Sequence, residues 1–177
     1  MKICVIPAAL AALAGMGLPA EAAPEQLRGK SVVINWTEQR RERNPATGQE
    51  QTVSLPFVFT AYISTADRIF NRLAVGRAGA SDQVRGLRDN AGFAARSVAF
   101  SGQRMTATNT FQSGGARQIS ATFDASFSSC SASVVIGRGG GNAPMRQRTI
   151  QGSIVEVLSV NAGAAGCAMS QGNALGN

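Results

Sequence analysis

The sequence predicts an all-β fold: an antiparallel meander of about seven or eight strands that closes as a small β-barrel, with a β-sandwich as the alternative. Two observations support this prediction. Apolar and polar residues alternate over most of the chain after residue 30, which is the two-residue period of a strand with one buried face. Short turn sequences such as Ser101-Gly102 and Ser113-Gly114-Gly115 separate the alternating runs. At most one short helix is expected.

Three strands are predicted in the first half of the chain. The segment 30–38 alternates, and its apolar face carries Val32, Ile34 and Trp36. Residues 39–52 are polar and are predicted to form a loop, or a long hairpin with a protruding tip. The segment 53–64 is the most apolar one, and Pro56 within it indicates a bulge or an edge position. The segment 68–75 alternates again, although a short helix would also fit it.

The second half of the chain shows the more regular β pattern. Residues 76–92 lack a clear period, and a short helical segment could begin at Ser81. Beyond them, strands are predicted over 93–100, 104–111, 118–127, 131–136 and 149–160. The cleanest alternation lies in 118–127, where one face carries Ile119, Ala121, Phe123, Ala125 and Phe127. We expect this face to be buried.

The N-terminus has the organisation of a secretory signal peptide over residues 1–22. Lys2 precedes an uncharged apolar stretch, Pro19 ends that stretch, and Ala20-Glu21-Ala22 supplies the small residues of a cleavage site. A membrane anchor is the alternative, but the stretch is short for a span of about 20 residues. The predicted organisation is a cleaved signal peptide over 1–22, one β domain over 23–161 and a small-residue tail over 162–177. The mature chain would be exported to the periplasm or the extracellular space.

Cysteine usage agrees with an exported chain. Cys4 falls within the signal peptide, so Cys130 and Cys167 remain after cleavage. An even number of cysteines in an oxidising compartment predicts a disulfide bond, which would pin the C-terminal tail. The chain contains no histidine, and two distant cysteines without histidine make a poor metal site. We therefore expect neither a metal nor another cofactor.

The chain is basic, with 17 Lys and Arg against 10 Asp and Glu, and cleavage of the signal peptide would remove one residue of each sign. Arginine suits bidentate contacts with phosphate and carboxylate groups. Two basic segments supply the candidate anion-binding residues, which are Arg40, Arg41, Arg43, Arg138, Arg146 and Arg148. The glycine-rich segment 137–142 lacks the Lys-Ser/Thr pair and the helix of a phosphate-binding loop. As alternatives to anion binding, the segment with Arg40, Arg41 and Arg43 could be a solvated charged turn, and the glycine-rich segment could be a flexible hairpin loop.

Composition argues against catalysis. Without histidine there is no Ser-His-Asp triad and no Cys-His pair. Asp124 and Glu156 lie within predicted strands, so they are the only carboxylates that could face inward as an acid/base pair. We favour the simpler interpretation that each faces solvent and pairs with a neighbouring arginine. No enzymatic activity is predicted.

Two other classes are also disfavoured. An outer-membrane barrel should carry aromatic girdles, but Trp36 and Tyr62 are the only aromatic residues besides phenylalanine. Nucleic-acid binding would need aromatic residues interleaved with the arginines, and Phe93 and Phe111 are expected in the core instead. After the signal peptide the sequence contains no apolar run long enough to cross a membrane as a helix.

The leading hypothesis is an exported, non-catalytic β-barrel binding module. Its ligand would be a small apolar molecule in the lumen, or a partner at the rim loops. The candidate lumen residues are Val32, Ile34, Trp36, Phe57 and Phe59. Two alternatives are an envelope protein that binds an anionic polymer through its arginines and an inhibitor of an exported enzyme. The sequence identifies no particular ligand or partner.

Overall fold

A computed structural model describes residues 22–77, 80–89, 98–111, 115–138, 145–150 and 152–175 of the chain. The predicted signal peptide lies outside these residues except for Ala22. Among the described residues, no helix is long and apolar enough to cross a membrane.

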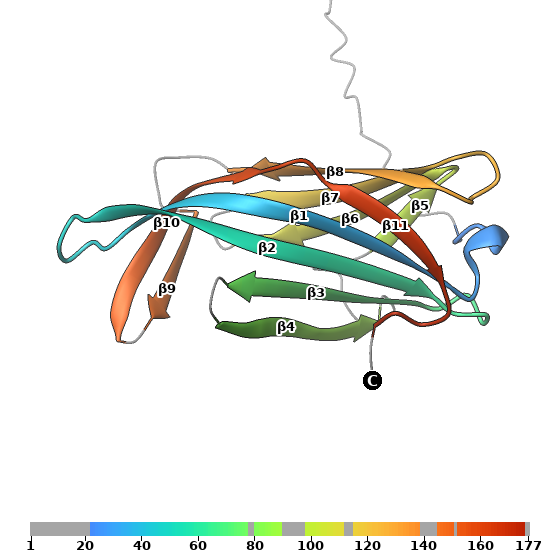
Figure 1. The fold of residues 1–177 in the computed structure, drawn as a ribbon, viewed down its shortest axis with the longest axis horizontal. Helices are drawn as coiled ribbons and strands as arrows, with labels where there is room; N and C mark the ends of the chain where they lie inside the picture. The colour runs from blue at the N-terminus through green and yellow to red at the C-terminus, as the bar shows by residue number, and fades with distance from the viewer. Residues whose placement is uncertain are drawn as a thin grey trace, which may run out of the picture.

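The fold is all-β and antiparallel, as predicted (Figure 1). One short 3-10 helix precedes eleven strands in the described part of the chain. In chain order the elements are η1 (Glu25–Leu27), β1 (Lys30–Arg43), β2 (Glu50–Ile63), β3 (Ile69–Arg77), β4 (Ala80–Asp89), β5 (Val98–Ser101), β6 (Arg104–Thr110), β7 (Ala116–Phe123), β8 (Cys130–Gly137), β9 (Arg146–Ile150), β10 (Ser153–Ala162) and β11 (Gly166–Gln171).

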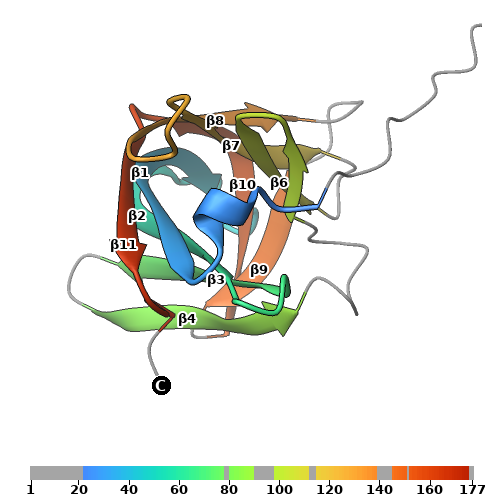
Figure 2. The ribbon, with the colours of Figure 1, turned by 90° about the vertical axis from the view of Figure 1, so that its right-hand side faces the viewer.

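The strands form two sheets. The larger sheet has the order β4-β3-β2-β1-β10-β9, and β11 also pairs with β1. The smaller sheet has the order β5-β6-β7-β8. The larger sheet is curled into a half-barrel, and the smaller sheet lies across its open side, so that the two enclose one core (Figure 2). The architecture is therefore barrel-like, although no hydrogen-bonded ladder joins the two sheets within the described residues.

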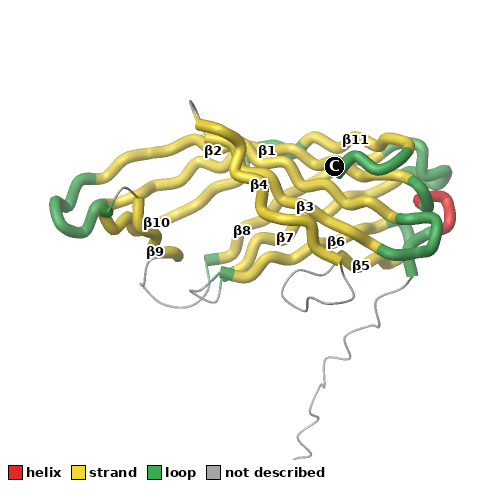
Figure 3. Tube along the Cα trace, turned by 90° about the horizontal axis from the view of Figure 1, so that it is seen from below, coloured by secondary structure: helices red, strands yellow, loops and turns green. Residues whose placement is uncertain are grey.

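The hairpin of β1 and β2 runs the length of the molecule (Figure 3). Its ladder continues without a register shift from the Lys30–Ile63 pair to the Arg43–Glu50 pair. Gly48 has a φ of 71° and donates its N–H to the carbonyl of Asn44 at 2.8 Å, which closes the tip. Residues 39–52 are therefore not a loop but the end of a long hairpin, which was the second of the two interpretations.

Pro56 lies in β2 without disturbing this ladder. Opposite it in β1 is Thr37. On the other side, the ladder between β2 and β3 begins only at Phe57. A proline cannot donate a ladder hydrogen bond, and this one is paired on a single side. The predicted bulge or edge position is therefore corrected: β2 is an interior strand, and Pro56 lies just beyond the end of its ladder with β3.

Four secondary-structure expectations are corrected. Residues 80–89 form β4 instead of a helical turn, and register shifts between β3 and β4 hide the alternation there. The strand predicted over 118–127 ends at Phe123, because the chain turns at Asp124. The segment 149–160 is split into β9 and β10 by Gly152, which has a φ of 81°. The tail after Ala162 contains β11, which pairs with the start of β1.

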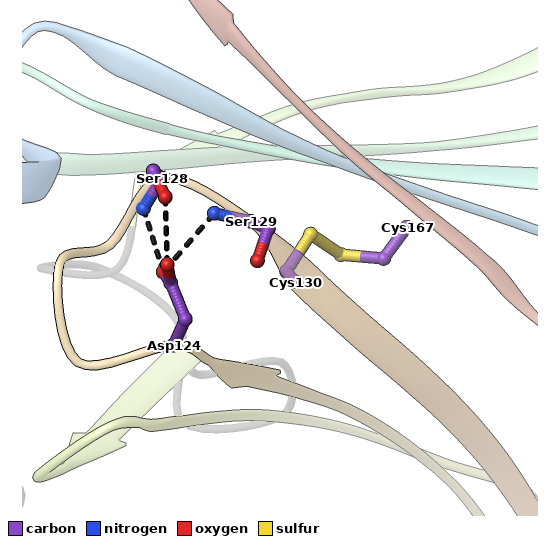
Figure 4. The surroundings of a disulfide bond; sticks show 5 residues. All are labelled: Asp124, Ser128, Ser129, Cys130 and Cys167. Carbon is purple, nitrogen blue, oxygen red and sulfur yellow. Dashed lines mark hydrogen bonds between the residues drawn. A yellow bond between two sulfur atoms is a disulfide. The ribbon is translucent and has the colours of Figure 1, made fainter.

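The predicted disulfide is formed between Cys130 of β8 and Cys167 of β11 (Figure 4). Because β8 belongs to the smaller sheet and β11 to the larger one, the bond links the two sheets covalently. The C-terminal segment is therefore held by this bond and also by the ladder between β11 and β1. The bond lies where β1 begins, since Cys167 is paired with Ile34.

The two ends of the barrel differ in their interior. At the end covered by η1 (Figure 2) the interior is apolar, and we call this the apolar end, defined by Leu27, Val32, Ile34, Ile63 and Phe123. Further along the same inward face of β1, the buried residues become charged. We call this the charged end, defined by Glu38 and Arg40 of β1 and Arg117 of β7. The candidate site lies at the charged end.

Candidate functional site

The charged end is built on the inward face of β1. Side chains alternate across a strand, so Trp36, Glu38 and Arg40 follow Val32 and Ile34 toward the interior, and all are buried. Glu38 is 0% exposed. Arg117 projects from β7 in the smaller sheet and is 3% exposed. The charged residues of the two sheets therefore meet across the core.

Both carboxylate oxygens of Glu38 are fully engaged. Arg117 donates from Nε to Oε1 at 2.6 Å, and its Nη2 lies 2.6 Å from the same oxygen. Trp36 also donates to Oε1, from Nε1 at 3.1 Å. Arg40 donates to Oε2 from Nε at 3.2 Å and from Nη2 at 2.8 Å. Charge-assisted hydrogen bonds of this kind are the strong ones in proteins.

This arrangement keeps Glu38 ionised. Burial by itself raises the pKa of the carboxyl, but the hydrogen bonds and charges of Arg117 and Arg40 outweigh it and hold the pKa below its ordinary value. Glu38 is therefore a carboxylate at neutral pH with no spare acceptor capacity. It is suited to hold the two guanidinium groups in place and unsuited to carry a proton.

Aromatic rings fix the guanidinium groups from their other faces. The Cζ atom of Arg117 lies 4.7 Å from the ring centre of Phe57 and 5.3 Å from that of Phe111. Arg40 lies over the same Phe57 ring at 5.1 Å. Trp36 stacks on Phe57 at 5.2 Å between ring centres. Cation–π contacts are stronger when desolvated, so these rings and Glu38 together leave the arginines little rotational freedom.

A cavity of about 270 Å³ opens beside these arginines. Its walls come from both sheets. Its described lining residues are Arg40, Phe57, Asn109, Thr110, Phe111, Arg117, Met145, Gln147, Val157 and Val160. The lining thus combines two cations, three uncharged polar side chains and an apolar wall, and no carboxylate belongs to this described set.

Each guanidinium keeps one nitrogen free of the Glu38 network. Nε and Nη2 of both arginines are used on the carboxylate. Within the described residues, the Nη1 atoms of Arg40 and Arg117 make no hydrogen bond. Neither of these atoms is among the buried polar atoms that lack a partner. Both residues line the cavity, so the arginine donors that Glu38 leaves unused belong to its wall.

Of the predicted anion-binding arginines, those whose side chains the structure describes do not form one patch. Arg40 points inward into the site, whereas Arg41 points outward, because adjacent residues of a strand face opposite sides. Arg41 is 58% exposed and lies 3.6 Å from Glu50, and Arg43 is ion-paired with Glu156 at 2.7 Å. Arg138 follows β8 and is exposed. The side chains of Arg146 and Arg148 lie outside the described part of the structure.

The predicted lumen residues divide into two groups. Val32, Ile34 and Phe59 pack in the hydrophobic core and are not among the described lining residues of the cavity. Phe57 lines the cavity, and Trp36 lies directly behind it in contact with Phe57. The cavity is thus not the apolar lumen that the sequence predicted, because the inward face becomes charged beyond Trp36.

Asp124 and Glu156, the only candidate acid/base pair, are each held by partners of their own. Asp124 lies in the turn before β8 and accepts hydrogen bonds from Ser128 and Ser129 (Figure 4). It also accepts one from the hydroxyl group of Ser126. The hydrogen bond from the Ser128 side chain is the largest cause that lowers the pKa of Asp124. For Glu156 the largest cause is the hydrogen bond from Arg43, which also lowers the pKa. Both carboxyl groups are ionised and engaged at neutral pH.

Sequence reasoning missed Glu38 and Arg117. Both could have been found by extending the alternation already seen. Glu38 continues the phase of Ile34 and Trp36, and Arg117 stands two residues before Ile119 on the buried face of β7. Charged residues in phase with a buried face indicate an internal ionic site, because isolated buried charges are costly. What the pattern could not show is that the two faces meet.

No family model, no curated protein and no solved structure matches this chain. The described residues contain no cluster of three or more His, Cys, Asp or Glu side chains that could hold a metal ion. The function is therefore argued from the fold and from the geometry of the charged end.

Proposed function

We propose that this protein is an exported, non-catalytic β-barrel protein that binds a small molecule in the cavity at its charged end. The observation that carries the proposal is the cavity itself, where rigidly held Arg40 and Arg117 stand beside an apolar wall of Met145, Val157 and Val160. Small-molecule sites combine an apolar lining with a few convergent polar groups. They also recur at the mouths of β-barrels.

The chemistry of the site supports binding rather than catalysis. A general acid or base needs a pKa near the working pH and room to exchange its proton. Glu38 has a lowered pKa and accepts hydrogen bonds from three residues. Histidine is absent from the whole chain. The buried charges are thus arranged to present a fixed electrostatic surface to a ligand.

The size of the cavity favours a compact ligand. Its volume of about 270 Å³ lies just under the roughly 300–1,000 Å³ that is common for sites of drug-sized molecules. A molecule with one ring or a short chain and one polar head fits this volume. A polymer would have to bind elsewhere, and the outward arginines Arg41 and Arg43 are already paired with Glu50 and Glu156.

Export is part of the proposal. The features of a signal peptide in residues 1–22 support it. So does the Cys130–Cys167 disulfide, since such bonds persist mainly in oxidising compartments. The ligand would then be met in the periplasm or outside the cell.

Native mass spectrometry of the protein purified from its own host tests the proposal. We expect a small-molecule adduct on the wild-type protein that is lost in Val160→Phe, which fills the cavity. Val58→Phe is the matched control, because Val58 is 38% exposed and lies outside the cavity lining; the adduct should remain there. Equal adducts on both variants, or none on the wild-type protein, would contradict cavity binding.

A further inference from the structure

We infer that the ligand of this cavity is an organic anion, a carboxylate or a phosphate ester with a short apolar body, whose oxyanion binds Arg40 and Arg117. This inference rests on the proposed small-molecule function and names its ligand class. It differs from the apolar ligand that the sequence suggested, because the charged end, not the apolar end, provides the cavity.

The first argument is charge. Two guanidinium groups stand in the cavity wall, and a single carboxylate, Glu38, holds both of them from behind. The buried carboxylates on this face of β1 are Glu38 and Glu42, and neither is one of the described lining residues of the cavity. Charges in a buried site interact more strongly than they would in water. The cavity therefore favours a negatively charged occupant over a neutral or positive one.

The second argument is the supply of donors that Glu38 does not use. The Nη1 atoms of Arg40 and Arg117 make no contact with Glu38 and belong to side chains that line the cavity. Carboxylate and phosphate oxygens are the preferred partners of guanidinium N–H groups. Asn109, Thr110 and Gln147 add uncharged hydrogen-bonding groups to the same lining. The lining therefore offers one oxyanion donors from both guanidinium groups and from neutral side chains.

The third argument is preorganisation. A free arginine loses side-chain entropy when it binds an anion, and this loss weakens affinity. Here Glu38, Phe57 and Phe111 already hold Arg117, while Glu38 and Phe57 hold Arg40. In this arrangement Glu38 is a positioning residue that holds both cations. In the same lining, Met145, Val157 and Val160 offer an apolar surface to the body of the ligand, and Val160 is the cross-strand neighbour of Arg40.

Trp36 provides the signal for a direct test. It is the only tryptophan in the chain, donates to Glu38 and lies 5.8 Å from the guanidinium of Arg117. We would titrate the whole protein with benzoate, phenyl phosphate, benzamide and benzylamine at constant ionic strength and follow Trp36 fluorescence. Benzoate and phenyl phosphate separate a carboxylate site from a phosphate site. Benzamide and benzylamine are the neutral and cationic analogues.

We expect at least one of the two anions to bind saturably and at least about tenfold more tightly than benzamide, with no binding of benzylamine. Benzamide binding as tightly as both anions, with binding lost in Val160→Phe, would overturn the inference and leave the proposed function standing. A response to none of the four probes would also overturn it. In that case, adducts in native mass spectrometry that depend on the cavity would still support the proposed function.

Variants locate the oxyanion. Arg40→Gln should weaken binding of the preferred anion at least tenfold, and Arg40→Lys, which keeps the charge but loses the planar fork, should give an intermediate loss. Arg41→Gln is the control, since Arg41 lies on the opposite face of β1. Circular dichroism checks that each variant is folded. Equal affinity in folded Arg40→Gln and Arg41→Gln would contradict the assignment to Arg40.

Discussion

The apolar end and the charged end of the barrel are built on the same strands but serve different purposes. At the apolar end, β1 presents Val32 and Ile34 inward, and packing under η1 leaves them 0% exposed. At the charged end, the same face presents Glu38 and Arg40, and a cavity remains. Burial of apolar surface stabilises a fold, whereas buried ion pairs contribute little net stability. Successive stretches of one strand thus supply a stabilising core and the proposed binding site.

The largest effect is expected for Glu38→Gln. The substitution leaves two buried guanidinium groups without a negative partner, and removing one partner from a buried ionic network costs about 3 to 5 kcal/mol. Urea unfolding followed by Trp36 fluorescence measures this loss. Glu50→Gln is the control, because Glu50 pairs with Arg41 at the surface, where a pair contributes about 0 to 1 kcal/mol. Similar losses in the two variants would show that Glu38 does not hold the charged end together.

Removal of the disulfide should lower the stability of the protein through the apolar end, without changing the charged end. The double variant Cys130→Ser/Cys167→Ser frees β8 from β11 and should lower the free energy of unfolding by about 2 to 4 kcal/mol, mainly by loosening the unfolded chain. Anion binding at the charged end should be retained while the protein is folded. Titration of the folded variant with the preferred anion at low temperature measures this affinity. A large loss of affinity in the folded variant would mean that the two ends are not independent.

A smaller effect is expected for Ile34→Val. Ile34 is 0% exposed in the apolar end, and loss of one buried methylene costs about 0.5 to 1.5 kcal/mol. Thermal unfolding should detect the change. The matched variant Val58→Ala, at a 38% exposed position, should change stability by no more than about 0.5 kcal/mol. Neither variant should alter anion affinity, and a change in either would place part of the ligand outside the charged end.

The last prediction concerns the pH dependence of stability, and no difference is expected near neutral pH. Because the pKa of Glu38 is lowered in the folded state, its contribution to stability is complete above the unfolded pKa of about 4.3. That contribution is lost as pH falls through the lower folded pKa. Wild-type protein should therefore lose stability in acid more steeply than Glu38→Gln. Asp124 and Glu156 also have lowered pKa values, so both proteins should carry Asp124→Asn and Glu156→Gln in this comparison. Parallel acid profiles would remove Glu38 as a source of the pH dependence.

The alternation of apolar and polar residues predicted much of the fold. Where the prediction failed, the cause is local. Alternation identified the inward face of β1 correctly from Val32 to Trp36. It failed over 80–89, where register shifts between β3 and β4 interrupt the two-residue period. The strand predicted over 118–127 ends at Phe123, because Asp124 accepts hydrogen bonds from serine residues and the chain turns there. Each error arises where a side-chain hydrogen bond or a bulge interrupts the two-residue alternation of the strand.

The amino-acid sequence alone was enough to predict an antiparallel β fold, a bond between Cys130 and Cys167, and the inward faces of β1 and β7. It could also have shown that Glu38 and Arg117 are in phase with buried residues. Only the tertiary structure decided that these two residues, 79 positions apart and in different sheets, meet. The reason is physical. The side-chain period is a property of one strand, whereas the site depends on how two sheets pack face to face.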